Sequence, residues 1–265
     1  MTEIDFFDIL QGQIVGFLLV LARTSGIFLI SPFFGVTNVS RQLRGGIAVA
    51  IAMIITPVIL NNSIIEAPDN IFLYAGTVLE ELFIGFTIGF IAYVAFSAIN
   101  MAGKIIDMQI GFSVANVMDP TSGQQAPLMG TFLYQLTMLC FLAANGHHII
   151  LGALVESFNR IPLDGMVWNN SLPTLMIDFT NGVFLTGMKI AMPVTFTILI
   201  VNVGMGILAR TMPQMNIFVV GIPLKLTIGM FMISMVLPFY ILFLDVMFND
   251  MYGNIAAALK SITPP

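Results

Sequence analysis

One stretch decides how the fold is interpreted: residues 103–130, GKIIDMQIGFSVANVMDPTSGQQAPLMG, interrupt a chain that otherwise consists of long apolar runs. A loop of this length with so little regular pattern is typically functional or disordered. Disorder is disfavoured because half of the stretch is apolar, including Ile105, Phe112 and Val117. Irregular backbone at membrane depth has to be buried in protein or line a water-filled path. We therefore interpret the stretch as a loop folded into an enclosed space, a candidate gate; the alternative is a membrane-surface loop that joins two spans.

The composition indicates an integral membrane protein, or a subunit buried on nearly all sides in an assembly. Of the 265 residues, 58% are hydrophobic and only 9% are charged, and the mean hydropathy is +0.98. Soluble domains carry roughly 25% charged residues, so this chain cannot form a water-facing surface alone. The net charge of −5 gives no basic surface for nucleic acid. The single cysteine, Cys140, excludes a disulfide framework and a cysteine metal site.

The order of apolar and polar segments predicts an all-α, multi-helix membrane-type protein of helical hairpins with kinked helices and a central re-entrant loop. We expect a single domain, 1–265, and no cleavable signal peptide, because acidic residues precede the first apolar run. An even number of runs places both termini on one side, and the Lys/Arg bias of the links favours the side outside the cytoplasm. The apolar runs are expected at about 9–30, 45–60, 71–101, 131–154, 173–208 and 217–248, with the candidate loop at about 103–130 and a short tail at 249–265.

Charged residues within the apolar runs argue against ordinary lipid-facing helices. Each charge at a bilayer centre costs about 2.5–3.5 kcal/mol on insertion scales. Such side chains must pair with each other, face a wet cavity or meet partner subunits, and for Glu80 and Glu81 the candidate partners are Lys104 and Arg23. Gly85 and Gly89 are spaced for close helix approach, as are Gly204 and Gly206. The side chains that we expect at partner contacts or a polar channel wall are Arg23, Glu80, Glu81, Lys104, Asp107 and Lys189, and Asp178 and Lys225 are further charges in apolar runs.

No pattern in the sequence indicates an enzyme, a cofactor or a metal. Glu80 and Glu81 are adjacent, so on a helix they point about 100° apart and do not form a shared acid–base pair. His147 and His148 have no third ligand at helical spacing, and we expect them at a helix end beside Asn145. Phosphate-loop and nucleophile-elbow patterns do not occur.

A second interruption lies between the fifth and sixth runs, where the sequence reads ARTMPQMNIFVVGIPLK over residues 209–225. Pro213 and Pro223 are expected to stop helix continuation, and Gly221 permits a tight backbone. The alternative is a polar turn. Its pattern R-x-x-P-Q-x-x-x-F-x-x-G-x-P-x-K is formed by Arg210, Pro213, Gln214, Phe218, Gly221, Pro223 and Lys225.

This pattern resembles that of the FliR family of flagellar export-gate proteins and their injectisome counterparts. The central stretch is similar too, in DMQIGFS from Asp107 and DPTS from Asp119, as is Asn145-Gly146-His147. The resemblance covers essentially the whole chain in length, hydropathy and motif order.

The resemblance implies a non-enzymatic, single-copy subunit that joins FliP and FliQ type subunits to close the channel of the flagellar type III export gate. The family packs as a helical assembly of hairpins, much of it above the bilayer plane. Implied contacts are FlhB and FlhA type export components, unfolded exported flagellar proteins and membrane lipid, at the bacterial inner membrane and flagellar basal body, with no nucleic acid. The family's plug corresponds here to Gly111, Phe112, Ser113, Val114, Ala115, Asn116, Val117, Met118, Asp119 and Pro120.

Two alternatives stay open at this point. The first is the equivalent export-gate subunit of a virulence injectisome, because both systems share this module. The second, from a different class, is a small-molecule secondary transporter, whose broken helices and intramembrane charges fit the composition. A transporter predicts an inverted internal repeat, and the halves 1–130 and 131–265 show none.

Overall fold

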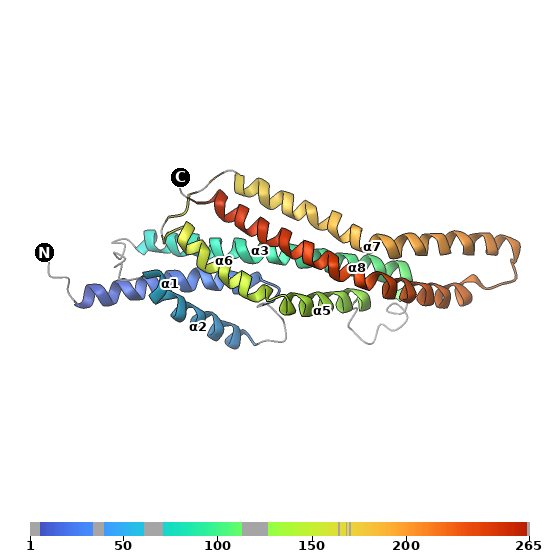
Figure 1. The fold of residues 1–265 in the computed structure, drawn as a ribbon, viewed down its shortest axis with the longest axis horizontal. Helices are drawn as coiled ribbons and strands as arrows, with labels where there is room; N and C mark the ends of the chain where they lie inside the picture. The colour runs from blue at the N-terminus through green and yellow to red at the C-terminus, as the bar shows by residue number, and fades with distance from the viewer. Residues whose placement is uncertain are drawn as a thin grey trace. The chain divides into compact units, whose positions relative to one another are not determined.

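The computed structural model describes residues 6–33, 40–60, 71–112, 127–163, 165–167, 169 and 171–263. Within these ranges all regular structure is helical, as expected for the predicted all-α class (Figure 1). The helices are α1 (Phe6–Ile30), α2 (Arg41–Leu60), α3 (Ile71–Ile110), α5 (Leu128–Ala143), α6 (Gly146–Arg160), α7 (Ser171–Thr211) and α8 (Ile217–Ser261).

Five of these helices, α1, α2, α3, α7 and α8, are long and apolar enough to cross a membrane, and a sixth span results if α5 and α6 count as one broken span. The break falls at Ala144 and Asn145, and Asn145 adopts a left-handed backbone with φ 55°. The multi-helix membrane class is therefore confirmed.

Three predicted boundaries were wrong. Residues 103–110 belong to α3, and the expected tail from 249 is the last part of α8, which ends at Ser261. The residues after the predicted run 131–154 are helical as far as Arg160, and Glu156 and Arg160 form an ion pair one turn apart on this helix. In each case polar residues that look like a loop in sequence lie within a helix.

The chain divides into two compact units, each built from several separate parts of the sequence. Unit 1 comprises residues 1–93, 145–179 and 250–265, and unit 2 comprises residues 94–144 and 180–249. The boundaries fall inside α3, α7 and α8, so each of these three helices contributes to both units.

Unit 1 is organised around a close crossing of α1 and α3. A Cβ atom on Gly85 would collide with the backbone carbonyl of Arg23, and one on Gly26 would collide with the carbonyl of Leu82. One turn further along α3, a Cβ on Gly89 would lie within 2.7 Å of Ile30. The predicted role of Gly85 and Gly89 in helix approach is thus confirmed, whereas Gly204 and Gly206 have no atoms within 4 Å of such a Cβ. α2 packs beside α1 and touches α6.

The core of unit 2 is an aromatic cluster with a buried hydrogen bond beside it. The ring of Phe96 from α3 lies 5.5 Å from Phe141 of α5 and 6.3 Å from Phe248 of α8. The hydroxyl groups of Thr137 and Tyr240 are 2.5 Å apart, and both residues are buried. α3, α5 and α8 are therefore joined by apolar packing and by a polar contact that selects one pairing of α5 with α8.

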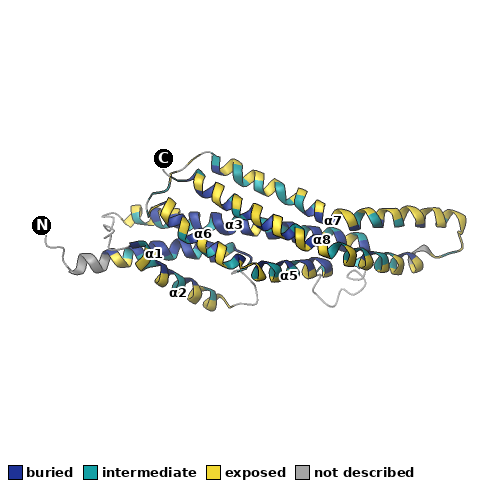
Figure 2. Cartoon of the chain, viewed as in Figure 1, coloured by how far each residue is buried: buried dark blue, intermediate teal, exposed yellow. Residues whose placement is uncertain are grey.

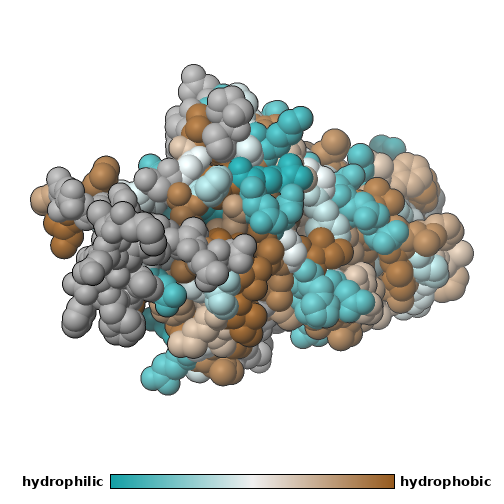
Figure 3. Space-filling model, turned by 60° about the vertical axis from the view of Figure 1, so that its left-hand side comes forward, coloured by the Kyte–Doolittle hydropathy of each residue, from teal (hydrophilic) through white to brown (hydrophobic). Residues whose placement is uncertain are grey.

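Much of the apolar surface remains uncovered within the chain. In Figure 2 exposed residues follow α2, α7 and α8 over long stretches, and only 28% and 22% of the most apolar windows of α7 and α8 are buried. Figure 3 shows apolar side chains spread over the visible face, with hydrophilic groups among them. The exposed apolar residues include Phe184, Phe196, Phe231 and Phe239. Such a surface requires lipid or other protein to cover it.

The crossing of α1 and α3 generates a prediction with an internal control. We expect Gly85→Ala to destabilise the protein by about 1–3 kcal/mol, because the added methyl group forces the two backbones apart. Gly76→Ala lies on the same helix, where a Cβ meets nothing within 4 Å. That change should be neutral or stabilising by up to about 1 kcal/mol, since alanine favours a helix over glycine. Thermal unfolding in detergent measures both variants, and equal melting temperatures would contradict the close crossing.

Candidate functional site

The first candidate site is the base of the central stretch, where α3 ends and α5 begins. Because α3 continues to Ile110, residues 103–110 are helical and do not belong to the predicted loop 103–130. Gly111 follows with φ 100°, a backbone conformation that favours glycine, and Phe112 is half-buried. Of the ten residues expected to form a plug, these two are described, and 113–120 lie outside the described residues.

Asp107 connects the two helices at this base. Its side chain is buried, and its carboxylate accepts hydrogen bonds from the backbone N–H of Met129, at 3.0 and 3.1 Å, and of Gly130, at 3.2 Å. These N–H groups belong to the first turn of α5, where backbone N–H groups have no hydrogen-bond acceptor within their own helix. Pro127 occupies the N-cap position and supplies no side-chain cap. Asp107 therefore caps α5 from a different helix, and the helix N-terminus also favours its negative charge.

The polar residues around Asp107 face in different directions along the end of α3. Lys104 is exposed, Gln109 is half-buried and Met108 is exposed. The sequence predicts both Lys104 and Asp107 at partner contacts or a polar channel wall. The structure separates them, because Asp107 is enclosed by its own chain and only Lys104 reaches the surface.

The second candidate site is a buried ion pair in unit 1. Arg23 of α1 is completely buried, and its Nε and Nη2 atoms donate to the two carboxylate oxygens of Glu81 of α3 at 2.5 and 3.0 Å. Nη1 donates to the hydroxyl of Ser157 at 3.1 Å, and Nη2 also donates to the carbonyl of Ile161 at 3.1 Å. The guanidinium carbon lies 4.0 Å from the centre of the Phe158 ring. One arginine thus joins α1, α3 and α6.

This geometry distinguishes the two neighbouring glutamates. Glu81 is 1% exposed and bound to Arg23, whereas Glu80 is exposed on the other side of the same turn. Of the two candidate partners named for them, Arg23 pairs with Glu81. Arg23 and Glu81 are therefore enclosed by their own chain, and their assignment to partner contacts or a polar channel wall stays a prediction.

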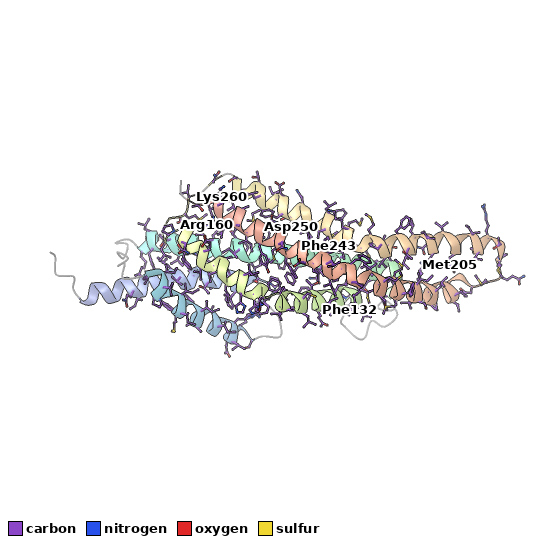
Figure 4. All side chains as sticks on the ribbon, viewed as in Figure 1. Phe132, Arg160, Met205, Phe243, Asp250 and Lys260 are labelled. Carbon is purple, nitrogen blue, oxygen red and sulfur yellow. The ribbon has the colours of Figure 1, made fainter. Side chains whose placement is uncertain are left out.

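The remaining charges in apolar helices lie on the outside of the chain. Asp178 and Lys189 of α7 are exposed, and Lys225 of α8 is half-buried. Asp250, seen on α8 in Figure 4, is also exposed. A lipid environment disfavours such groups, so they are the described side chains best suited to contacts with other protein or with water.

The 209–225 motif forms the turn of the hairpin between α7 and α8. Arg210 lies at the end of α7, Pro213 and Gln214 lie in the connection 212–216, and all three are exposed. Pro223 does not stop the helix as predicted but lies inside α8, where its carbonyl accepts a hydrogen bond from the Thr227 hydroxyl at 2.9 Å. The other motif positions, Phe218, buried Gly221 and half-buried Lys225, also lie within α8.

His147 and His148 lie at the start of α6, as expected. Their ring centres are 4.1 Å apart, and the ring of Phe33 stacks on His147 at 5.7 Å. Among the residues that the structure describes, no three potential metal-binding side chains gather at one place.

Sequence reasoning missed Ser157, Phe158 and Gly130, which complete the two sites. Each contacts a residue far away in the sequence: Arg23 for the first two and Gly103 for the third. The sequence signal for the site around Arg23 is the position of this arginine in an apolar run, since an arginine in an apolar helix requires several hydrogen-bond acceptors nearby.

Removal of the Glu81 carboxylate provides the test of the second site. We expect Glu81→Ala to destabilise the protein by about 3–5 kcal/mol, because Arg23 is left as an uncompensated buried charge. Glu80→Ala, one residue away and exposed, should cost much less. The double variant Arg23→Met/Glu81→Leu should recover most of the loss, since an apolar pair of similar volume removes both charges. Thermal unfolding in detergent gives the comparison, and equal effects of Glu80→Ala and Glu81→Ala would contradict the assigned pairing.

Proteins of one family are similar to this chain over most of its length. The family model described as bacterial export proteins, family 1, matches residues 14–251. The chain is 36% identical over 220 residues to the flagellar biosynthetic protein FliR of Bacillus subtilis (strain 168), which covers 82% of this chain and 84% of the relative.

Two further relatives carry the same name. FliR of Escherichia coli (strain K12) is 28% identical over 242 residues, covering 91% of this chain and 92% of the relative. FliR of Aquifex aeolicus (strain VF5) is 30% identical over 240 residues, covering 88% of this chain and 90% of the relative. Together with the all-helical, membrane-type fold, these matches show that the chain belongs to the bacterial export proteins, family 1, the family that its sequence motifs resemble.

Proposed function

We propose that this chain is a non-enzymatic membrane component of the flagellar type III protein export apparatus, in which it completes a channel together with FliP and FliQ type subunits. The FliR relatives are named for flagellar biosynthesis, which supports the flagellar system over the injectisome. The family model, described as bacterial export proteins, supports export over small-molecule transport.

The observation that carries this proposal is the mismatch between three helices and a bilayer. α3, α7 and α8 contain 40, 41 and 45 residues. At 1.5 Å per residue their contour lengths are about 60–68 Å, roughly twice the hydrocarbon thickness of a membrane. Tilt alone would have to reach about 60°, well beyond the usual range of about 0–40°. These helices therefore require surroundings other than lipid for much of their length.

The exposed charged side chains support protein, in addition to lipid, as the surroundings of these long helices. Lys189 lies near the middle of α7, and Asp245 lies on α8 between exposed apolar residues. Lipid alone would leave both groups without polar contacts. Partner subunits can supply apolar surface and polar contacts at once, as intersubunit surfaces commonly do. FliP, FliQ, FlhB and FlhA type proteins are the partners that we assign, at the inner membrane of the basal body.

The central segment is the proposed plug of this channel. Phe112, Val114, Val117 and Met118 would exclude water and ions in the closed state, and Gly111 would permit the segment to move when an unfolded protein passes. The left-handed backbone of Gly111, which glycine adopts without strain, supports this residue as the point where α3 ends and the proposed plug begins.

Deletion of 111–119 tests the plug directly. We expect the variant to assemble with its partner subunits at normal stoichiometry but to make the membrane permeable to small ions, because the channel loses the side chains that seal it. Ion flux into liposomes that contain the purified complex measures the effect, with the undeleted complex as control. Unchanged flux in a correctly assembled complex would refute the plug assignment.

A further inference from the structure

The exposed side of α2 is apolar from position 43 to the end of the helix. The buried residues Ala48, Ala52 and Ile55 repeat at helical spacing, so they form one buried side, and α2 packs beside α1. The exposed residues from 43 to 58 are all apolar or glycine, and the large ones among them are Leu43, Ile47, Met53, Ile54 and Val58. Such a side has to be covered by lipid or by another protein.

The polar atoms of α2 distinguish between these two kinds of cover. After Arg44 the helix has a single polar side chain, that of Thr56, and its hydroxyl donates to the carbonyl of Ala52 at 2.7 Å. Contact surfaces between proteins combine apolar area with hydrogen bonds, roughly one per 100–200 Å². Beyond Arg44, the exposed side of α2 offers a partner protein no side chain for such hydrogen bonds. α7 and α8 differ, because Lys189 and Asp245 lie exposed among their apolar residues.

The length of α2 matches the hydrocarbon layer of a bilayer, in contrast to the much longer α7 and α8. Its 20 residues extend about 30 Å at 1.5 Å per residue, which is the thickness of that layer. The remaining part of the chain's α2 surface therefore needs no protein neighbour to cover it.

The charged side chains of α2 lie at one end only. Arg41 is exposed in the first turn, Arg44 is half-buried one turn further, and the Ser40 hydroxyl accepts the N–H of Leu43 at 3.3 Å, which fixes the start of the helix here. A guanidinium at the end of an apolar helix can bind the phosphate group of a lipid while the apolar side chains stay among the acyl chains.

We infer that the acyl chains of the lipid bilayer cover the exposed side of α2, with Arg41 at the phosphate groups of anionic lipids. This inference does not depend on the proposed plug, and it limits the surface that partner subunits cover. The chain then has two kinds of outer surface. Lipid covers α2, whose exposed side is apolar and of bilayer length, and protein covers the exposed charges of α7 and α8.

The test places a photoreactive side chain on α2 of the full chain, expressed in its own membrane together with its partner proteins. Irradiated p-benzoylphenylalanine forms a covalent bond with whatever lies next to it. Ile54→p-benzoylphenylalanine should give several-fold more lipid adducts than crosslinks to other proteins, as measured by mass spectrometry. Phe196→p-benzoylphenylalanine, at a residue of α7 that is 62% exposed, is the matched control and should give the reverse. Val58→p-benzoylphenylalanine repeats the measurement one turn away from Ile54 if that variant does not accumulate.

A second measurement tests the lipid phosphate at Arg41. The chain is purified with the proteins bound to it and mixed with micelles that contain phosphatidylglycerol, and native mass spectrometry counts the lipids that stay bound. Arg41→Gln should lower this number several-fold, because one basic side chain near anionic headgroups is lost. Lys260→Gln removes another exposed cation, at the end of α8, and should leave the number unchanged.

The outcomes separate this inference from the proposed function. Crosslinks from Ile54 mainly to another protein would overturn the lipid cover of α2, and so would the absence of any adduct at Ile54 while Phe196 reacts, which indicates water. Lipid adducts at both positions support the inference and contradict the proposed protein cover of α7. Equal lipid loss in Arg41→Gln and Lys260→Gln would overturn the assignment of Arg41 to lipid phosphate.

Discussion

The structure depends on one constraint: an ionised side chain inside an apolar helix needs polar partners, because apolar surroundings provide none. The chain satisfies this constraint internally at Arg23 and Asp107. Arg23 finds a carboxylate, a hydroxyl and a carbonyl on α3, on α6 and just beyond its end. Asp107 finds the free N–H groups at the start of α5. Each residue joins segments that are far apart in the sequence, and each pairing fixes which helices pack together.

The sequence predicts the class of the fold well and its contacts poorly. The six apolar runs match the number of candidate spans when α5 and α6 count as one broken span, because hydropathy largely decides which segments can cross a membrane. The loop prediction at 103–110 was wrong because Lys104, Asp107 and Gln109 look like loop residues, although they lie on a helix. The hydrogen-bond partners of the Asp107 side chain come from another helix, α5. Pro223 was assigned as a helix stop for a similar reason, whereas a long apolar helix tolerates a proline near its start.

In the candidate sites, too, the sequence does not predict which residues contact each other. An arginine in the first apolar run indicates that a carboxylate or another acceptor lies nearby. Whether Arg23 pairs with Glu80 or with Glu81 depends on which face of α3 contacts α1. That face is set by the glycines Gly85 and Gly26, which permit backbone contact. The capping of α5 by Asp107 spans 22 residues and leaves no local pattern, so it becomes visible only in three dimensions. The motif at 209–225, in contrast, lies at an exposed hairpin turn and was recognisable without the structure.

Where the chain does not enclose its own charges, it requires other molecules. Asp178, Lys189 and Asp245 lie on the outside of helices that are about twice as long as a bilayer is thick. The proposed assembly with partner subunits would account for both features, because neighbours would cover the apolar faces and supply polar contacts at the charges.

The most direct measurement of this account is native mass spectrometry of the tagged chain, extracted from its own membrane in a mild detergent. The account predicts a discrete complex in which one copy of this chain is bound to several copies of other small apolar membrane proteins. A stable species that contains only this chain and lipid, with no other protein bound, would contradict it.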